Sequence, residues 1–181
     1  GDKKPYSCQD AAGNPVVDCF PEEGTAHQIN HMIFGSDGSL FVASGDGINY
    51  SDGSLRAQDL NRLSGKVLRV NPFTGAGYAN NPYFDGDINS NRSKVWLYGM
   101  RNPFRIALSP FSGNLMVAEV GNNKWEEITE AGKGANLGWP CFEGPIPNAY
   151  DPICQPVLNG TSAVISPTYS YPHSGGRGAA I

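Results

Sequence analysis

LFVAS at residues 40–44 and LMVAE at residues 115–119 are two similar stretches that stand 75 residues apart, each preceded by a glycine-containing turn. Short apolar runs bounded by turn residues are typical of β-strands. After each stretch the chain reaches a further strand-like run, at residues 66–70 and 125–129. Repeated antiparallel units joined by connections of unequal length predict a β-propeller, and a β-sandwich is the competing architecture.

The strands expected around this repeat fall into two sets, separated by turns rich in Gly, Pro, Asn and Asp. They cover Ile29–Phe34, Ser39–Ser44 and Gly65–Val70 in the first set, and Lys94–Tyr98, Phe104–Leu108, Asn114–Glu119 and Glu126–Glu130 in the second. Helical periodicity is weak everywhere, although Arg56–Leu63 has the pattern of one or two helical turns. The expected fold class is therefore all-β: about two to three propeller blades, each a four-stranded antiparallel sheet.

Composition excludes several classes of protein. The 181 residues include 23 glycines and 14 prolines, and only 17% are charged, which argues against a helical bundle or coiled coil. The net charge of −4 argues against a nucleic-acid partner, and no run of 18 apolar residues is present to span a membrane. At 75 residues per repeat, the chain holds fewer than three repeats, which is too few to close a propeller. We therefore expect residues 27–181 to be central blades, truncated at both ends. Residues 1–26 are expected to be a loop region pinned by one disulfide.

The four cysteines form two local pairs, Cys8 with Cys19 and Cys141 with Cys154. Four cysteines permit three pairings, and the short loops favour these two bonds, with free buried thiols as the alternative. The spacing is unlike that of a structural zinc site. Disulfides favour an oxidising compartment, so the chain is expected to be secreted or periplasmic.

A series of motifs in a fixed order resembles the glucose/sorbosone dehydrogenase family, over about residues 27–140. The motifs are HQ at 27–28, FGSDGSLFV at 34–42, GDG at 45–47, GKVLRV at 65–70, YGMRNPFR at 98–105, AEVG at 118–121, WEEI at 125–128 and KGANLGWP at 133–140. The resemblance implies a six-bladed propeller and oxidation of an aldose or related sugar. It also implies pyrroloquinoline quinone (PQQ) and calcium as cofactors and an external electron acceptor.

The resemblance assigns His27 as the general base on the sugar hydroxyl and Asp46 as the carboxylate that orients and charges it. The chemistry is consistent, because a carboxylate stabilises the imidazolium that forms when a hydroxyl proton is abstracted. The alternative is a surface histidine and an ordinary turn aspartate. His31 lies four residues further on, and its spacing to the glycine turns fits the family pattern less well than that of His27.

Arg101 and Asn102 match the family positions beside the reacting centre, where the arginine stabilises developing negative charge and both residues hold the cofactor. A guanidinium offers forked donors to quinone or carboxylate oxygens. The alternative is an arginine that pairs with Asp or Glu across blades. Trp125 and Trp139 are interpreted as blade packing.

The resemblance also places two calcium sites. The backbone carbonyls of Gly121 and Asn122 match the ligands of the calcium that accompanies PQQ, since calcium accepts hard oxygen donors. Glu126 and Glu127, with the carbonyl of Leu137, match a second, structural site. Adjacent carboxylates on a strand point to opposite faces, so a solvent-facing acidic edge is the alternative.

The leading functional hypothesis is a PQQ- and calcium-dependent aldose dehydrogenase that transfers a hydride from sugar C1 to the quinone. The rival from another class is a non-catalytic extracellular propeller that binds carbohydrate or protein through its rim loops. A third hypothesis is a calcium-stabilised structural domain. Retention of His27, Asp46 and Arg101 together favours the enzyme.

Overall fold

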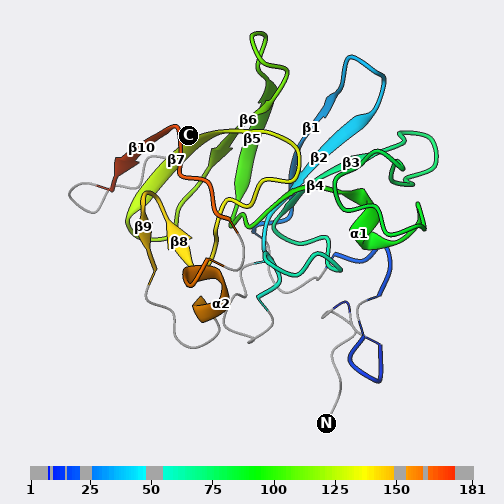
Figure 1. Cartoon of the computed structure of the whole chain (residues 1–181), viewed down its shortest axis with the longest axis horizontal. Helices are drawn as coiled ribbons and strands as arrows, with labels where there is room; N and C mark the ends of the chain where they lie inside the picture. Colours follow the sequence, from blue (N-terminus) through cyan, green and yellow to red (C-terminus); the bar gives the residue numbers. More distant parts are fainter. Residues whose placement is uncertain are drawn as a thin grey trace.

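The computed structural model describes Cys8 and residues 10–14, 16–20, 26–47, 55–148, 154–160 and 163–173. Two four-stranded antiparallel sheets dominate these residues and lie side by side (Figure 1). The first has the order β1-β2-β3-β4, and the second has the order β5-β6-β7-β10. This architecture confirms the expected all-β fold of neighbouring propeller blades.

The strands of the first sheet are β1 (Ile29–Phe34), β2 (Leu40–Ser44), β3 (Lys66–Val70) and β4 (Val95–Tyr98). Those of the second are β5 (Pro103–Leu108), β6 (Leu115–Glu119), β7 (Trp125–Ala131) and β10 (Tyr169–Pro172). A small hairpin of β8 (Phe142–Glu143) and β9 (Ile146–Pro147) and two short helices, α1 (Asn91–Lys94) and α2 (Gln155–Leu158), complete the described elements.

Seven of these strands agree with the predicted ones to within one residue at each end. The predicted grouping was wrong for the strand at 94–98, which was assigned to the second set but pairs with β3 of the first sheet as β4. The fourth strand of the second sheet, β10, was not predicted, and it pairs with β7 in antiparallel register. The expected helical turns over Arg56–Leu63 are present only as hydrogen-bonded turns, in which the Gln58 and Asp59 N–H groups donate to the carbonyl of Leu55.

Alternation along the strands builds an apolar core between the two sheets. Phe41 and Ala43 of β2 face this core, and Val42 between them faces a second cluster on the other side of the first sheet. Residues Ile106, Leu115 and Val117 supply the facing surface from the second sheet. Strand β1 packs beside β5, so the two inner strands adjoin each other. The core therefore fixes the two sheets relative to one another.

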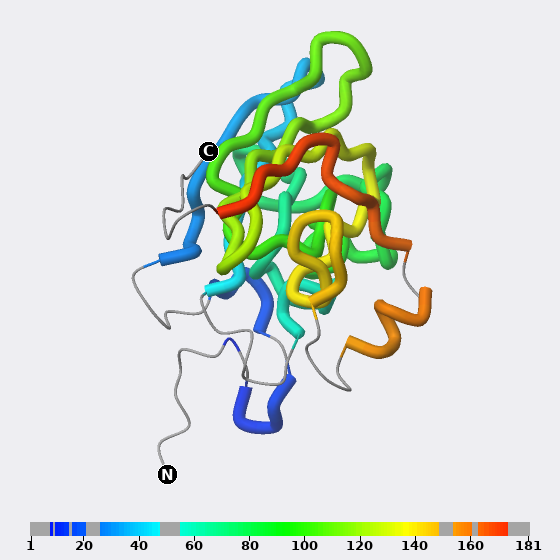
Figure 2. The backbone as a smooth tube through the Cα atoms, turned by 90° about the vertical axis from the view of Figure 1, so that its left-hand side faces the viewer, coloured from blue at the N-terminus to red at the C-terminus, as the bar shows by residue number. Residues whose placement is uncertain are grey.

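Both predicted disulfides form, Cys8–Cys19 and Cys141–Cys154, and no described cysteine is free. The described N-terminal residues lie at the end of the molecule opposite the tips of the β1–β2 and β5–β6 hairpins (Figure 2). Asp18 forms an ion pair with the buried Lys94 there. The boundary between a loop region and the blades at residue 26 stays a prediction.

Neither helix in the part of the chain that the structure describes is long or apolar enough to cross a bilayer.

A buried lysine attaches the segment 55–64 to the first sheet. Lys66, at the start of β3, is fully buried, and its ammonium donates to the carbonyls of Arg56, Ala57 and Ser64 at 2.8, 3.0 and 2.7 Å. A buried ammonium is tolerated only where such acceptors replace water. The three bonds therefore attach residues 55–64 to the start of β3.

Replacement of this ammonium tests its role. We expect Lys66→Met to lower the free energy of unfolding by about 2 to 4 kcal/mol, because three buried carbonyl oxygens lose their donor. Chemical denaturation measures the effect. The matched control is Lys133→Met, since Lys133 is exposed, and it should stay within about 0.5 kcal/mol of the wild type. Equal stabilities of the two variants would contradict this role.

Candidate active site

The predicted site residues gather at one edge of the two sheets. His27 precedes β1, Asp46 follows β2, Arg101 follows β4, and a loop of residues 120–124 connects β6 to β7. Because neighbouring strands run antiparallel, the start of β1 and the ends of β2, β4 and β6 lie at the same edge. The Asp37-Gly38 turn belongs to the opposite edge.

His27 and Asp46 form the predicted pair. The imidazole Nδ1 lies 2.7 Å from Asp46 Oδ1, and the two side chains are 10% and 3% exposed. The contact fixes the ring, because an imidazole that donates through Nδ1 presents the lone pair of Nε2 to its other side. His31 is placed differently: its Nδ1 accepts the backbone N–H of Ile106 at 3.1 Å, across to the second sheet.

Glycine at position 45 allows this close approach. A Cβ on Gly45 would lie 2.5 Å from the backbone oxygen of His27. Two backbone bonds join these segments: Gly45 N–H donates to Gln28 at 3.0 Å, and Gly47 N–H donates to His27 at 3.2 Å. His27 itself has a positive φ of 58°, which is uncommon for a residue with a side chain. The pairing of the two segments thus presents the imidazole to Asp46.

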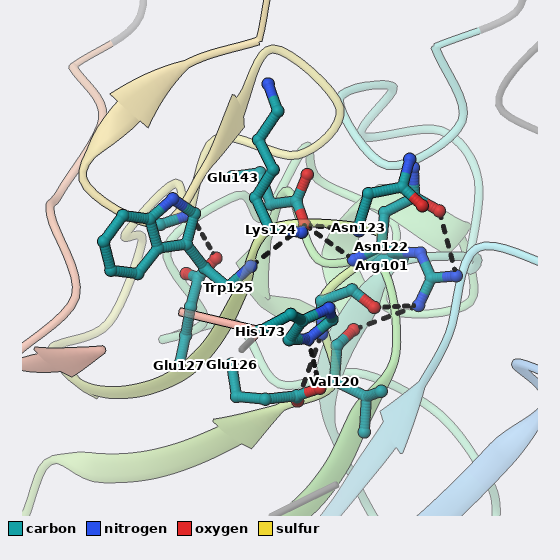
Figure 3. A network of polar contacts seen from close by, with 12 residues as sticks. Arg101, Val120, Asn122, Asn123, Lys124, Trp125, Glu126, Glu127, Glu143 and His173 are labelled. Carbon is teal, nitrogen blue, oxygen red and sulfur yellow. Dashed lines mark hydrogen bonds and ion pairs between the residues drawn. The ribbon is translucent and has the colours of Figure 1, made fainter. Parts of the chain in front are cut away.

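Arg101 adjoins this pair. The backbone N–H of Asp46 donates to the carbonyl of Arg101 at 2.8 Å. The Arg101 guanidinium turns toward the 120–124 loop, where Nη1 donates to the carbonyls of Val120 at 3.1 Å and Gly121 at 2.7 Å (Figure 3). Its Nη2 lies 3.4 Å from Asn122 Oδ1. The loop therefore anchors the cationic group.

A buried carboxylate holds the backbone on the other side of Arg101. Glu119 Oε1 accepts the N–H groups of Arg101 and Asn102. Burial and then the neighbouring Glu127 carboxylate raise the pKa of Glu119 well above its ordinary value, against the opposite effect of those two N–H donors. The side-chain oxygen of Asn102 accepts a bond of 2.6 Å from Asn30 in β1, which joins the two sheets at this edge.

Glu143 holds the 120–124 loop itself. One of its oxygens accepts four consecutive backbone N–H groups: those of residues 122, 123 and 124 at 2.8 Å each, and that of Trp125 at 3.3 Å (Figure 3). Burial acts to raise the pKa of Glu143, but these donors together outweigh it and hold the pKa below its ordinary value. The carboxylate is thus the anion at the centre of a backbone nest.

Glu126 binds the same loop from the other side. Its Oε2 accepts the N–H of Gly121 at 3.3 Å, and its Oε1 lies 2.7 Å from Nε2 of His173, which directly follows β10 (Figure 3). A Cβ on Gly121 would lie 1.5 Å from the backbone oxygen of Trp125, so the loop closes this tightly only with glycine. Two buried glutamates therefore fix the carbonyls that anchor Arg101.

The residues predicted for the second calcium have separate partners in the structure. Glu126 bonds Gly121 and His173, Glu127 accepts the N–H of Gly144, and Leu137 packs its side chain in the core between the sheets. Burial raises the pKa of Glu127 to about 7, opposed by the Gly144 N–H and reinforced by the Glu143 and Glu126 carboxylates. Among the described residues, no three His, Cys, Asp or Glu side chains form a group that could hold a metal ion. Both calcium sites stay predictions.

Four residues of this edge were missed as site residues: Glu119, Trp139, Glu143 and His173. Trp139 was expected only to pack, yet its indole Nε1–H donates to Asp46 Oδ2 at 2.8 Å. Glu119 and Trp139 stand inside the quoted motifs, where their position was the available signal. Glu143 and His173 lie outside the motifs, and their spacing carries no such signal.

Loss of the Glu143 charge tests the nest. We expect Glu143→Gln to lower the free energy of unfolding by about 1 to 3 kcal/mol at pH 7 and to speed amide exchange at residues 122–125. Because the folded-state pKa lies below the unfolded one, this contribution is complete above the ordinary carboxyl range and is lost on acidification through the folded value. The difference between variant and wild type should shrink accordingly.

Denaturation at a series of pH values, with exchange measured at neutral pH, checks this expectation. The matched control is Glu130→Gln. Glu130 lies on β7, the same strand as Trp125, and its carboxylate accepts the hydroxyl of the exposed Ser112. A pH dependence identical to that of the control would exclude the nest as a source of stability.

The family model "Glucose / Sorbosone dehydrogenase" matches residues 15–179. The chain is 29% identical over 167 residues to the HIPL1 protein of Arabidopsis thaliana, covering 83% of this chain and 24% of that protein. It is 32% identical over 133 residues to quinoprotein glucose dehydrogenase B of Acinetobacter calcoaceticus, covering 65% of this chain and 27% of that protein. The chain thus spans about a quarter of the length of these curated relatives.

A solved structure has the same fold. The PQQ-bound aldose sugar dehydrogenase of Streptomyces coelicolor aligns with a TM-score of 0.64 at 24% identity, covering 91% of this chain and 44% of that one. Together with the motifs and the paired sheets, the family match shows that the chain belongs to the glucose/sorbosone dehydrogenase family.

Proposed function

We propose that this chain carries the base, its carboxylate partner and the cationic stabiliser of a PQQ-dependent aldose dehydrogenase. The observation that carries this proposal is the convergence of His27, Asp46 and Arg101 at one edge. A 2.7 Å contact joins the first two, and a 2.8 Å backbone bond joins Asp46 to Arg101. The quinoprotein name of the Acinetobacter relative supports the same assignment.

His27 is the proposed general base. Donation of Nδ1–H to Asp46 leaves Nε2 to accept the proton of the sugar C1 hydroxyl. The buried carboxylate then stabilises the imidazolium, and its attraction is strong because the pair is largely shielded from water. Asp46 thereby acts as the charge partner and fixes the tautomer.

Arg101 is the proposed electrostatic stabiliser. Its guanidinium is held by two backbone carbonyls, so little reorganisation is needed when negative charge develops nearby. A planar fork of five N–H donors suits quinone and carboxylate oxygens. These donors fit an anionic quinone, and Arg101 with Asn102 would hold PQQ, which when bound supplies the hydride acceptor.

The oxygen atoms beside Arg101 fit a calcium ion only in part. The backbone carbonyls of Gly121 and Asn122 are the expected ligands and are hard donors. The Gly121 carbonyl also accepts the Arg101 guanidinium at 2.7 Å. Calcium requires six to eight oxygens, so an anionic cofactor must complete the set. We retain Gly121 and Asn122 as its proposed ligands, and Glu126, Glu127 and the Leu137 carbonyl as those of a second ion.

The proposed setting is an oxidising compartment, with an external acceptor taking the electrons from the reduced cofactor. The two disulfides support secretion or a periplasmic location.

A second candidate function is a non-catalytic propeller that binds carbohydrate or protein through its rim. The observation that favours it lies at the opposite edge, where NPFTG at 71–75 and SPFSG at 109–113 form matching turns. The side chains of Phe73 and Phe111 at these turns are 94% and 98% exposed. Exposed aromatic rings are typical of contact surfaces.

Replacement of the base distinguishes the two functions. With PQQ and calcium added to the full-length protein, we expect dye-coupled oxidation of aldoses, and His27→Gln should lower kcat/KM by about 10²- to 10⁴-fold, the usual contribution of a general base. The matched control is His31→Gln, which retains an acceptor for Ile106 and should oxidise sugar at close to the wild-type rate.

Equal losses in the two histidine variants would contradict a specific role of His27. Absence of any sugar oxidation by the wild-type full-length protein, loaded with both cofactors, would favour the binding module.

A further inference from the structure

Both carboxylate oxygens of Asp46 have a side-chain partner. Oδ1 contacts the His27 imidazole at 2.7 Å, and Oδ2 accepts the Trp139 indole N–H at 2.8 Å. Asp46 is 2% exposed and Trp139 is 3% exposed, so both contacts are shielded from water. A carboxylate held at both oxygens cannot rotate, and the oxygen that faces the imidazole is therefore fixed.

The same indole lies against Arg101. The guanidinium carbon of Arg101 is 5.7 Å from the centre of the Trp139 ring, within the range of a cation–π contact. Nη1 of the guanidinium is fixed by Val120 and Gly121. One side chain thus touches the partner of the base through its N–H and the cationic group through its ring.

Trp139 is itself held by backbone bonds. Its backbone N–H donates to the carbonyl of Gly99 at 2.9 Å, and its backbone carbonyl accepts the side-chain Nε2–H of Gln58 at 2.8 Å. Gly99 lies two residues before Arg101, and Gln58 belongs to the segment that Lys66 attaches to the sheet. The backbone of Trp139 is therefore bound to both segments that flank the site, and this fixes where its indole lies.

We propose that Trp139 is a positioning residue that fixes Asp46 for His27 through its indole N–H and sets the orientation of Arg101 through its ring. This inference rests on the proposed function. It replaces the expectation that Trp139 is only a packing residue of the blade. A packing role requires an aromatic ring of similar size, whereas the positioning role requires the N–H group.

The charged groups that contact this assembly come from three connections. Asp46 follows β2, Arg101 follows β4, and Glu119 at the end of β6 binds the backbone N–H of Arg101. Protonation of His27 changes the charge next to Asp46 Oδ1. The hydrogen bond at Asp46 Oδ2 transmits this change to the indole N–H of Trp139. The two side chains should consequently report the same protonation event.

The first experiment uses the wild-type full chain without cofactor. In ¹⁵N-labelled protein, the Trp139 indole N–H resonance should move with pH in step with the His27 ring resonances, and this movement should disappear in His27→Gln. The indole of Trp96, which packs against Phe41 away from the site, is the internal control. A Trp139 resonance that ignores the protonation of His27 overturns the proposal.

The second experiment removes only the indole donor. Trp139→Phe in the cofactor-loaded chain should lower kcat about ten- to hundredfold with KM within about twofold, because the base is misplaced while sugar binding is retained. The pH profile of kcat/KM should also be displaced. Trp96→Phe is the matched control, with kcat and the profile unchanged.

The two arms separate failure of this inference from failure of the proposed function. If the two resonances are coupled but the protein oxidises no sugar, Trp139 still positions the His27–Asp46 pair, and only the proposed dehydrogenase function is contradicted. Sugar oxidation with an unchanged kcat and pH profile in Trp139→Phe would overturn the inference alone. Unchanged ring resonances of His31 and His173 show that the variant is folded.

Discussion

The buried carboxylate of Asp46 is the contact on which this edge of the molecule depends. It is almost fully removed from water, and such a charge is stable only where donors surround it. Its side chain joins a histidine before β1 and a tryptophan after β7, and its backbone N–H joins the connection after β4. Three segments distant in sequence are thereby held in one arrangement around a single acidic group.

Glutamates repeat this principle around Arg101. Glu119, Glu126 and Glu143 each accept backbone N–H groups, and none of these three carboxylates is paired directly with the guanidinium. The guanidinium donates to the neutral carbonyls of Val120 and Gly121 instead, so no carboxylate takes up its N–H donors. An arginine held in this way keeps its attraction for an anionic ligand. The carboxylates affect the guanidinium indirectly, because they fix the backbone of Arg101 and of the loop that binds it.

The sequence predicted most of the sheets because their strands are short apolar runs closed by glycine, proline and asparagine turns. It failed at β10, where YSYP alternates weakly and ends in proline. The pair of His27 and Asp46 was expected from the family resemblance that the ordered motifs carry. Contacts between distant segments were beyond reach: Trp139 meets Asp46 across 93 positions, and nothing in either motif indicates which side chain takes the second carboxylate oxygen.

Glu143 illustrates why the rest was missed. Its function depends on four amides in another connection, and backbone donors leave no trace in residue identity. The Cys141–Cys154 bond stands next to it, and the cysteine spacing did predict that bond. Covalent and apolar patterns are thus readable in the chain, whereas hydrogen bonds to the backbone become visible only in three dimensions.

The strands separate two edges of very different character. Five or six residues of extended chain place about 15 to 20 Å between them, and the packed core fills the interval. Substitutions so far apart contribute nearly additively. Substitutions in the aromatic turns at 71–75 and 109–113 should therefore carry no energetic penalty at the histidine edge, so the two edges are free to evolve separately.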